Sequence, residues 1–411
     1  MQLPEAFTQY TRQLFGDERF DRYLQSFSEE APVSIRMNPL KCENMTVGDG
    51  EPVAWCRHAF YLHRRPTFTM DPLLHAGCYY VQEAASMFLD EVLRQLLPYH
   101  PAMADSPGKS TMHHALDLCA APGGKSTLLR AALPADWMLY SNEPVRQRAN
   151  ILAENISKWG WSNHRVTNAY PHDYRRAKAR FDVILCDVPC SGEGMFRKDP
   201  ATIREWSPQQ VDKCQQLQRQ IVDDAWACLN DGGLLIYSTC TFNTKENEEN
   251  VRYFLEQYDG EILPVETKPE WHVSGSLLEG FDQPVYRFIP GTTRSEGLFV
   301  CAIRKSGTSR RTASPRLQLR DVQTVALDAE SPHVELSYQQ AIAYLRHEAL
   351  RLPDDAPRGI VTVCFLGHPL GPAKNIGSRA NNLYPKEWKI KTTHIPSDYE
   401  AILRHTEPHT D

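Results

Sequence analysis

The sequence has no long apolar run and no sign of a leader. Apolar stretches such as residues 183–186 and 234–237 fall far short of the ~20 residues that a membrane helix needs. Residues 1–5 carry neither a basic start nor an apolar core, so no signal peptide is expected. We therefore expect a cytoplasmic chain with no membrane partner.

Paired metal-binding or redox cysteines are also missing. The 11 cysteines are scattered, and no two of them form a Cys-x-x-Cys pair, which argues against a zinc ribbon, so no metal is expected. Without a secretion signal, an odd number of cysteines indicates reduced thiols. There is no repeat or low-complexity segment, and the net charge is only −6. Any basic surface for nucleic acid must therefore be local.

The chain length of 411 residues predicts two to three domains. Residues 1–75 combine an expected helix with short expected strands, which indicates a small α+β module. Residues 76–305 form the main domain, and residues 306–320 are interpreted as a basic linker. Residues 321–411, with Gly, Pro and Asn turns between short apolar segments, are expected to form a small β-rich C-terminal module.

The main domain alternates between expected strands and expected helices. These are residues 115–119, 138–143, 181–187 and 234–239, and residues 82–97, 125–133, 146–159 and 215–229, respectively. Such alternation predicts an α/β fold with a doubly wound parallel sheet. Ligands bind such sheets at the carboxyl ends of the strands, where the sequence places Asp117, Glu143, Asp187 and Cys240.

Residues 117–126, Asp-Leu-Cys-Ala-Ala-Pro-Gly-Gly-Lys-Ser, form a glycine-bearing turn between an expected strand and an expected helix. A phosphate-binding loop would need glycine at Cys119, and a dinucleotide fingerprint would need a third glycine. A tight turn of small residues remains, which is either a plain strand-to-helix turn or a place where a ligand approaches the backbone. Glu143 ends the next strand, as the acid that accepts ribose hydroxyls does in nucleotide folds, which favours a nucleoside-bearing ligand.

Two cysteines follow buried strands near this turn. Cys190 lies in the elbow after Asp187, and Cys240 ends the strand at residues 234–239. A lone cysteine is usually a packing residue, but two at neighbouring strand ends favour chemistry. A free thiol is mostly protonated at neutral pH, and Lys125 is placed to lower its pKa if it reaches the site. Residues 243–251 are interpreted as a structural helix start with acids in the first turn.

Segments 117–126, 187–194 and 238–250 resemble the motifs of the RNA cytosine-C5 methyltransferases of the NOL/NOP/SUN family. Segments 34–41 (SIRMNPLK) and 80–86 (YVQEAAS) resemble it too. Segment 381–388 (NNLYPKEW) resembles the PUA-like tail of its bacterial ribosomal-RNA branch, the RsmF-like proteins. The resemblance covers nearly the whole chain. It implies a Rossmann-like class I methyltransferase core between a small α+β N-terminal module and a PUA-like RNA-binding module.

The resemblance also implies S-adenosylmethionine as the cofactor. Its expected contacts are Cys119, Ala120, Ala121, Pro122, Gly123, Gly124, Lys125, Glu143, Arg148 and Asp187. The family usually has an acid near Tyr170 for the adenine amino group. This chain offers Tyr170 itself, or Asp173 three residues later.

By the same resemblance, Cys240 is the nucleophile that adds to cytosine C6, and Cys190 is the second cysteine that frees the product. Asp187 would contact N3 of the base, and Lys125 would stabilise charge. The implied activity is 5-methylcytosine formation in RNA, with 16S ribosomal RNA as the expected substrate and transfer RNA as the alternative. A non-catalytic RNA-binding assembly factor is a third reading. The N-terminal module, which would be RNA-recognition-like, and the basic residues near 304–320 and 374–391 are candidates for phosphate contact.

Overall fold

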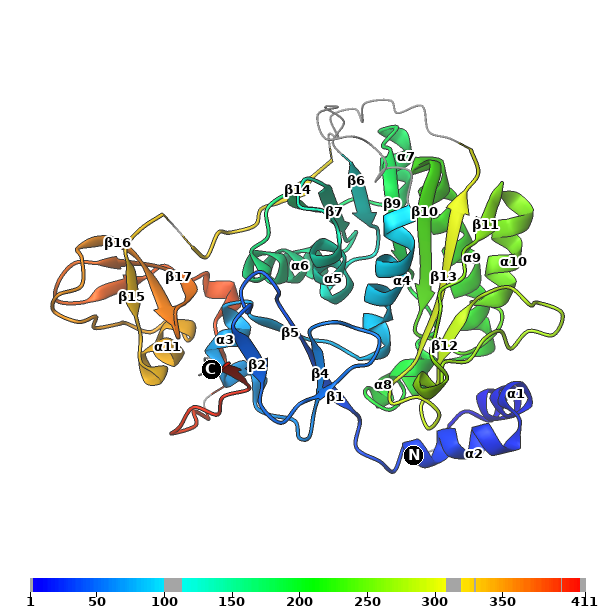
Figure 1. Cartoon of the computed structure of the whole chain (residues 1–411), viewed down its shortest axis with the longest axis horizontal. Coiled ribbons are helices and arrows are strands. Elements are labelled where there is room, and N and C mark those ends of the chain that lie inside the picture. Colours follow the sequence, from blue (N-terminus) through cyan, green and yellow to red (C-terminus); the bar gives the residue numbers. More distant parts are fainter. Residues whose placement is uncertain (1–2, 100–112, 308–318, 329, 393, 407–411) are drawn as a thin grey trace, which may run out of the picture.

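A large mixed β-sheet forms the centre of the molecule (Figure 1). The computed structural model describes residues 3–99, 113–307, 319–328, 330–392 and 394–406. Within these residues nine strands form this sheet, in the order β11-β13-β10-β9-β6-β7-β8-β14, with β12 also paired to β13. They are β6 (His114–Asp117), β7 (Met138–Asn142), β8 (His164–Thr167), β9 (Phe181–Asp187), β10 (Leu229–Thr239), β11 (Gly260–Ile262), β12 (Tyr286–Phe288), β13 (Leu298–Lys305) and β14 (Asp321–Val322).

The five central strands, from β10 to β8, are parallel, whereas β13 and β14 run antiparallel to their neighbours. The predicted doubly wound class I methyltransferase core is therefore confirmed, with antiparallel edges that the sequence did not indicate. The chain order reverses between β6 and β9, so this is the switch point at which such sheets bind ligands. Asp117 and Asp187 end these two strands.

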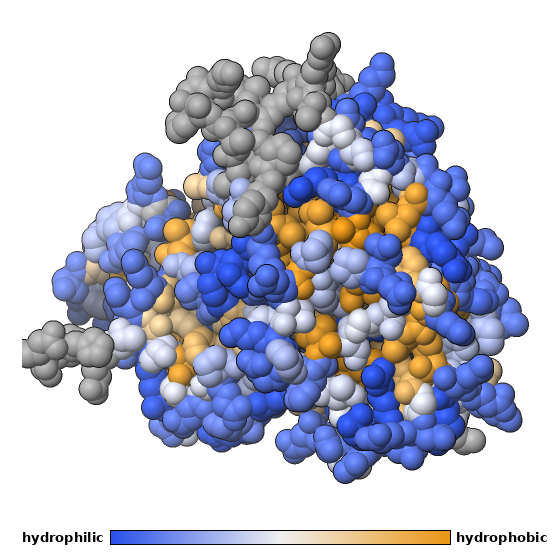
Figure 2. Space-filling view, turned by 45° about the vertical axis from the view of Figure 1, so that its right-hand side comes forward, coloured by the Kyte–Doolittle hydropathy of each residue, from blue (hydrophilic) through white to orange (hydrophobic). Residues whose placement is uncertain are grey.

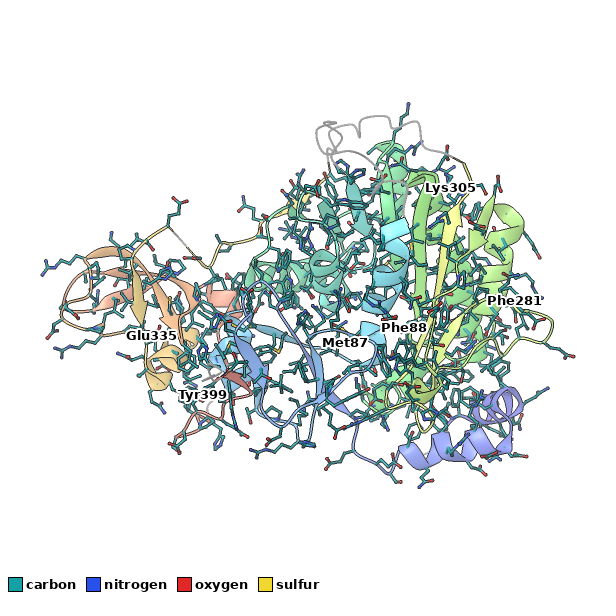
Figure 3. The ribbon with its side chains drawn as sticks, viewed as in Figure 1. Met87, Phe88, Phe281, Lys305, Glu335 and Tyr399 are labelled. Atoms are coloured by element: carbon teal, nitrogen blue, oxygen red, sulfur yellow. The ribbon has the colours of Figure 1, made fainter. Side chains whose placement is uncertain are left out.

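Helices cover both faces of the sheet because successive strand residues point to opposite sides. Val183 and Leu185 pack with α4 and α5, whereas Ile184 and Cys186 pack with α9 and α10. The helices of this domain are α4 (Phe88–Leu96), α5 (Gly124–Ala132), α6 (Arg146–Trp159), α7 (Pro171–Arg176), α8 (Pro200–Glu205), α9 (Pro208–Cys228) and α10 (Glu248–Gln257), with short η2 (Ala85–Met87), η3 (Leu97–Tyr99), η5 (Glu193–Met195) and η6 (Pro269–Trp271). In Figure 3, Met87 and Phe88 lie between the N-terminal sheet and the central sheet.

The N-terminal module has two parts. Helices α1 (Glu5–Phe15) and α2 (Asp17–Ser26) pack an aromatic face on the central domain through Phe7, Phe15 and Tyr23, against Phe196 and Phe242. A four-stranded sheet, β3-β4-β1-β5, follows. Its elements and neighbours are β1 (Val33–Met37), β2 (Met45–Val47), β3 (Glu51–Pro52), β4 (Ala59–Leu62), η1 (Phe68–Met70), α3 (Pro72–His75) and β5 (Tyr79–Val81).

The C-terminal module shares one hydrophobic core with the N-terminal sheet. Its last strand pairs with β2, and the Tyr399 hydroxyl, labelled in Figure 3, donates a hydrogen bond to Asp71 at 3.2 Å. The module consists of β15 (His333–Glu335), α11 (Tyr338–Leu345), β16 (Gly359–Phe365), β17 (His368–Asn375), β18 (Ala380–Asn382), η7 (Lys386–Trp388) and β19 (Leu403–His405). The two modules are thus held together by packing and by strand pairing.

Several expected boundaries differ from the structure. Residues 82–84 are not helical, because the Glu83 carboxylate accepts the backbone N–H groups of Ala85 and Ser86 and so caps the helical segment that begins at residue 85. Helix α10 begins at Glu248, not at residue 243. Helix α9 begins earlier than expected, at Pro208, where the Ser207 hydroxyl caps its first turn.

Two other differences concern the strands. Among the short strands expected in residues 1–75, the one near residues 55–62 is confined to Ala59–Leu62. Strand β14 pairs with β8 of the central sheet, although its residues were assigned to the C-terminal module. Strand β5 pairs with β1 of the N-terminal sheet, although its residues lie after position 75 and were assigned to the main domain. Most of the basic linker lies outside the described residues, so the division at 75, 305 and 320 stays a proposal.

The surface is mixed in character. On the face shown in Figure 2, hydrophobic residues gather in the middle and hydrophilic residues surround them. No helix among the described residues is both long and apolar enough to cross a membrane. Nor do the described segments contain a cluster of three or more His, Cys, Asp or Glu that would hold a metal ion.

Candidate functional site

A cavity of about 360 Å³ opens at the switch point of the central sheet. It lies where the N-terminal sheet faces the ends of β6, β9 and β10. Its walls are formed by Tyr80, Val81, Gln82, Glu83, Ser86, Asp117, Cys119, Ala120, Ala121, Pro122, Gly124, Lys125, Asp187, Val188, Gly194, Met195, Lys198, Cys240, Glu296, Gly297 and Leu298. The structure therefore brings most of the predicted site residues to one place, which we call the active cavity.

The turn after β6 forms one wall of the active cavity. Its backbone is fixed by hydrogen bonds from Ala120 N to Asn142 O at 2.8 Å and from Asn155 Nδ2 to Pro122 O at 2.8 Å. Gly123 has a φ of 118° in the left-handed region, and a Cβ there would lie 3.2 Å from Leu152. Gly123 itself is not part of the lining; it lets the turn enter α5 so that its neighbours can face the cavity.

Glu143 and Arg148 lie behind this turn. Glu143 is only 2% exposed and does not line the active cavity. Its carboxylate accepts Val145 N at 2.9 Å and pairs with Arg148 at 3.3 Å. Arg148 also donates to Ala121 O at 3.1 Å, so it joins the acid to the turn.

The sequence offered two residues for the adenine contact, and both lie outside the lining of the active cavity. Tyr170 is 60% exposed and its ring stacks on His172. Asp173 accepts the Tyr170 backbone N–H at 2.9 Å, which caps α7. Neither side chain lines the active cavity.

Asp117 is the one fully buried carboxylate in the lining. Its Oδ2 accepts Ser126 Oγ at 2.6 Å, and its Oδ1 has no hydrogen-bond partner among the described residues. Burial raises the pKa of Asp117 to about 7. A buried acceptor without a partner is costly, so a ligand with a donor group, such as the ammonium of an amino acid, fits beside it. The small-residue turn and this acceptor together suit a methionine-bearing cofactor.

The raised pKa of Asp117 predicts a pH effect on stability. An unfolded Asp titrates near pH 4, so between about pH 4 and 7 the folded state keeps a proton that the unfolded chain has lost. Stability from this group is present below that window and is lost as the pH rises through it. We expect Asp117→Asn to become more stable relative to the unmodified chain, by roughly 2–4 kcal/mol, from pH 4 to pH 8. Urea unfolding at several pH values measures this, and a difference that does not change with pH contradicts it.

The two cysteines lie together at the base of the active cavity. Cys190 Sγ and Cys240 Sγ are 3.2 Å apart, and both residues are partly exposed. Cys240 lines the active cavity and Cys190 lies behind it. The hydrogen bond with Cys240, together with burial, raises the pKa of Cys190 well above that of a free thiol. Cys190 therefore holds its proton in this arrangement.

Lys125 and Asp187 form an ion pair in the wall beside the thiols. Lys125 Nζ lies 2.9 Å from Asp187 Oδ2, and Ser238 Oγ donates to Oδ1 at 2.7 Å. Burial alone would lower the pKa of Lys125, but the ion pair with Asp187 outweighs it and raises the pKa. Cys240 adds to the rise in the pKa of Lys125. Lys125 thus reaches the site, as the sequence analysis required.

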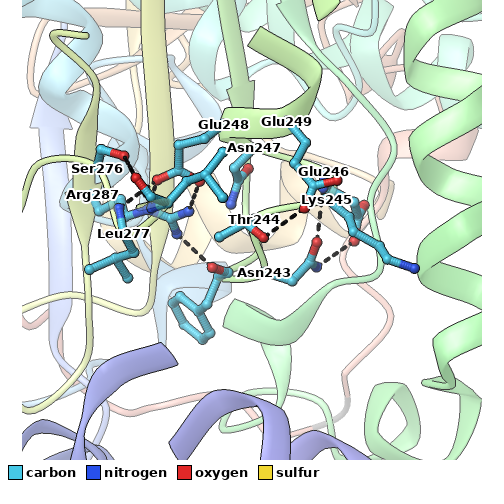
Figure 4. Close-up of polar contacts among 12 residues, drawn as sticks. Asn243, Thr244, Lys245, Glu246, Asn247, Glu248, Glu249, Ser276, Leu277 and Arg287 are labelled. Atoms are coloured by element: carbon cyan, nitrogen blue, oxygen red, sulfur yellow. Dashed lines mark hydrogen bonds and ion pairs between the residues drawn. The ribbon is translucent and has the colours of Figure 1, made fainter. Parts of the chain in front are cut away.

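Two carboxylates that sequence reasoning missed fix the loops that carry the thiols. Glu193 accepts Phe242 N and Asn243 N, at 2.6 and 3.0 Å, and also the indole N–H of Trp206. Glu246 accepts Ser191 N at 3.0 Å and the side-chain amides of Gln218 and Asn243. Figure 4 shows the polar contacts of residues 243–249. Residues 243–247 of the segment read as a helix start are therefore a loop held by side chains, and α10 begins at Glu248 with Glu248 and Glu249 in its first turn.

The rest of the wall comes from the N-terminal motif 80–86 and from residues near 296, which were not among the predicted site residues. Glu83 Oε1 accepts Glu296 N at 3.0 Å, so the two segments are tied together. Gly194 lets the thiol loop and residue 296 lie close together, because a Cβ on Gly194 would lie 2.8 Å from Cys240 O and 3.0 Å from Glu296 O. The resemblance of segment 80–86 to family motifs could have indicated that this segment belongs to the site.

Comparisons with known proteins agree with this architecture. The model of the 16S rRNA methyltransferase RsmB/F family matches residues 107–304. The N-terminal domain of 16S rRNA methyltransferase RsmF matches residues 3–84, and the methyltransferase RsmF PUA domain matches residues 331–390. The three matches follow one another in the order of the three parts of the fold.

Similar proteins carry related names. A ribosomal RNA small subunit methyltransferase F from Erwinia tasmaniensis is 27% identical over 93% of this chain and 96% of that protein. One from Cronobacter sakazakii is 33% identical over 76% of this chain, which spans 65% of that relative's length. The crystal structure of a methyltransferase homologue from Pyrococcus horikoshii is 26% identical, with a TM-score of 0.59 over 74% of this chain and 95% of that one. The chain belongs to the RsmB/F family of methyltransferases, in the branch with RsmF-type N-terminal and PUA domains.

Proposed function

We propose that this chain uses S-adenosylmethionine to methylate C5 of a cytosine in RNA, with 16S ribosomal RNA of the small subunit as the substrate. The observation that carries the proposal is the pair of thiols, 3.2 Å apart, at the edge of a cavity that also holds Lys125 and Asp187. The names of the relatives favour ribosomal RNA over transfer RNA.

The cofactor is assigned to the turn after β6. Residues 119–125 would hold it along their backbone, Glu143 would take the ribose hydroxyls, and Arg148 would orient Glu143. Asp117 Oδ1 would accept a hydrogen bond from the ammonium group of the cofactor. When bound, this cofactor supplies an electrophilic methyl group.

Cys240 would make cytosine reactive. C5 is a poor nucleophile, and addition of the Cys240 thiolate to C6 makes an enamine in which C5 carries electron density. Covalent catalysis of this type divides one difficult step into easier ones. The positive charge of Lys125 stabilises the thiolate. The cytosine must leave any RNA stack to reach the active cavity.

Asp187 and Cys190 would handle charge and protons. Negative charge builds on N3 and O2 after addition, and Asp187 lies at the end of β9 to contact N3. Once C5 carries the new methyl group, its proton must leave and the C6–S bond must break. Cys190 lies against Cys240 Sγ and is the proposed base for this elimination, directly or through water. It can take this role once Cys240 Sγ is bonded to C6, because the hydrogen bond with Cys240 that raises the pKa of Cys190 is then gone; such a base contributes about 10²–10⁴ in rate.

The RNA contacts are proposed to be local. The tail offers Lys374, Lys386, Lys389 and Lys391 around β17 and η7. Lys305 is a weaker candidate, because its ammonium donates to Trp226 O and Leu229 O at the end of α9. Arg310, Arg311 and Arg316 lie outside the described residues. Tyr384 is buried in the core of the C-terminal module, so it is not free to stack on a base.

Tritium release tests the function. RNA that carries [5-³H]cytidine is incubated with the protein and S-adenosylmethionine, and we expect one tritium released per methyl group added. Purified small subunits, their 16S RNA and transfer RNA compete in parallel reactions. Methylation without tritium release contradicts methylation at C5. If transfer RNA is the preferred substrate, the assignment changes from 16S ribosomal RNA to transfer RNA. No cofactor binding by calorimetry would support a non-catalytic assembly factor.

A further inference from the structure

A second cavity of about 230 Å³ lies next to the active cavity, and the chemistry proposed above does not use it. Tyr80 and Val81 line both cavities, so a single strand separates them. The second cavity lies between β5 and the end of α6. Its floor is the buried Gly77, Tyr79, Lys158 and Trp159.

The N-terminal motif 34–41 builds this floor. Arg36 stacks on the Trp159 ring at 4.6 Å, and Asn38 Nδ2 donates to Gly77 O and Trp159 O, both at 2.9 Å. Lys41 Nζ donates to Lys158 O at 2.7 Å. Gly77 has to be glycine here, because its φ is 72° and a Cβ would overlap Lys158 O. The second cavity is therefore a built feature.

Two hydrogen-bond donors of the floor have capacity for a ligand. Trp159 Nε1 is buried and has no hydrogen-bond partner among the described residues. Lys158 Nζ donates to Glu154 at 2.6 Å and lies 3.5 Å from His75 Nδ1, which leaves one of its three protons. Leaving a buried donor without a hydrogen-bond partner costs free energy. A ligand with a carbonyl oxygen would supply the missing acceptor.

We propose that the second cavity receives the nucleobase of an RNA nucleotide next to the methylated cytosine, and that Trp159 Nε1 and Lys158 Nζ bind its carbonyl oxygen. This rests on the proposed function, since it takes the substrate to be RNA. Aromatic walls from Tyr79, Tyr80 and Trp159 suit a flat ring, as single-stranded RNA is held by stacking and edge contacts. The volume is below the 300–1,000 Å³ of pockets for drug-sized ligands, which suits one base.

The position of the second cavity agrees with an RNA path. Lys158 Nζ lies 5.7 Å from the centre of the Trp388 ring in η7, so the C-terminal module lies next to a lysine that lines the second cavity. Asn155 lines this cavity and donates to Pro122 O of the cofactor turn. An RNA strand held by the C-terminal module would cross the second cavity before its cytosine enters the active cavity.

A scan with abasic RNA tests the proposal. The RNA fragment with the modified cytosine is prepared intact and with an abasic nucleotide at each flanking position. Affinity is measured by fluorescence anisotropy for the unmodified chain, Lys158→Gln, and Lys213→Gln as a control that loses an exposed lysine on α9. We expect one abasic position to weaken binding of the unmodified chain by about 10-fold. Lys158→Gln should bind intact RNA about as weakly as the unmodified chain binds that abasic RNA, and the abasic nucleotide should then cause almost no further loss of affinity. In Lys213→Gln the same abasic nucleotide should still weaken binding as it does in the unmodified chain.

The proposal is overturned if an abasic nucleotide at each flanking position weakens RNA binding by the same factor in Lys158→Gln and in the unmodified chain. Leu74→Trp fills the second cavity from its rim. This variant is used as the test if Lys158→Gln lowers the melting temperature. If Leu74→Trp binds intact RNA as tightly as the unmodified chain, the proposal also fails. Failure of the proposed function is separate: it shows as an absence of methyl transfer to intact RNA by the unmodified chain.

Discussion

Cys240→Ala is expected to abolish methyl transfer to RNA, whereas Cys190→Ala is expected to accumulate a covalent RNA–protein adduct. The reason lies in the different positions of the two thiols: Cys240 lines the active cavity, and Cys190 lies 3.2 Å behind it. Without Cys240 no bond to C6 forms. Without Cys190 the bond forms but elimination loses its base, and turnover falls by about 10²–10⁴.

Denaturing gels of protein with cytosine-containing RNA and cofactor separate these outcomes. An adduct band should appear strongly for Cys190→Ala, and neither adduct nor methylated RNA should appear for Cys240→Ala. Cys214→Ala is the matched control, because Cys214 is buried in α9 and does not line the active cavity. Full activity of Cys240→Ala, or an adduct in both variants, would refute the assignment of roles.

The central fold could be predicted because its signals are local. The apolar run that ends at Asp187 is β9 as expected, and the helix at residues 146–159 ends at Gly160, whose φ of 79° is the usual end of a helix. The helix start expected in residues 243–251 is present, with acids in its first turn, but it lies at Glu248 and not at residue 243, because the contacts that hold the preceding residues are distant in the chain. Phe242 N and Asn243 N bind Glu193, about 50 positions earlier in the chain.

The same limit applies to the site. The turn after β6 and both cysteines follow from short motifs at strand ends, and the structure brings them together at one edge of the sheet. The opposite wall depends on the contact between Glu83 and Glu296, which are 213 positions apart. Local patterns carry no information on such a contact. The second cavity likewise depends on how Arg36 of β1 meets Trp159 of α6.

The largest effect on stability is expected from Arg287→Met. Arg287 and Glu248 are 1% and 0% exposed, and they form an ion pair that Figure 4 shows. Arg287 Nε donates to Glu248 Oε1 at 2.9 Å, and its Nη1 donates to Phe242 O at 2.7 Å. Methionine leaves the Glu248 carboxylate buried without its counter-charge. Breaking a buried pair in this way costs about 3–5 kcal/mol, which urea unfolding measures.

The double variant Glu248→Gln with Arg287→Met separates charge from packing. If the unpaired carboxylate causes the loss, removing its charge should recover part of it, because a neutral amide is cheaper to bury than a charge. Arg12→Met is the surface control: Arg12 pairs with Asp17 in solvent, where ion pairs contribute little. Equal losses in the single and double variants would mean that the contact with Phe242 O, and not the buried charge, sets the cost. In that case methyl transfer should fall together with stability, since Phe242 stands two residues after Cys240.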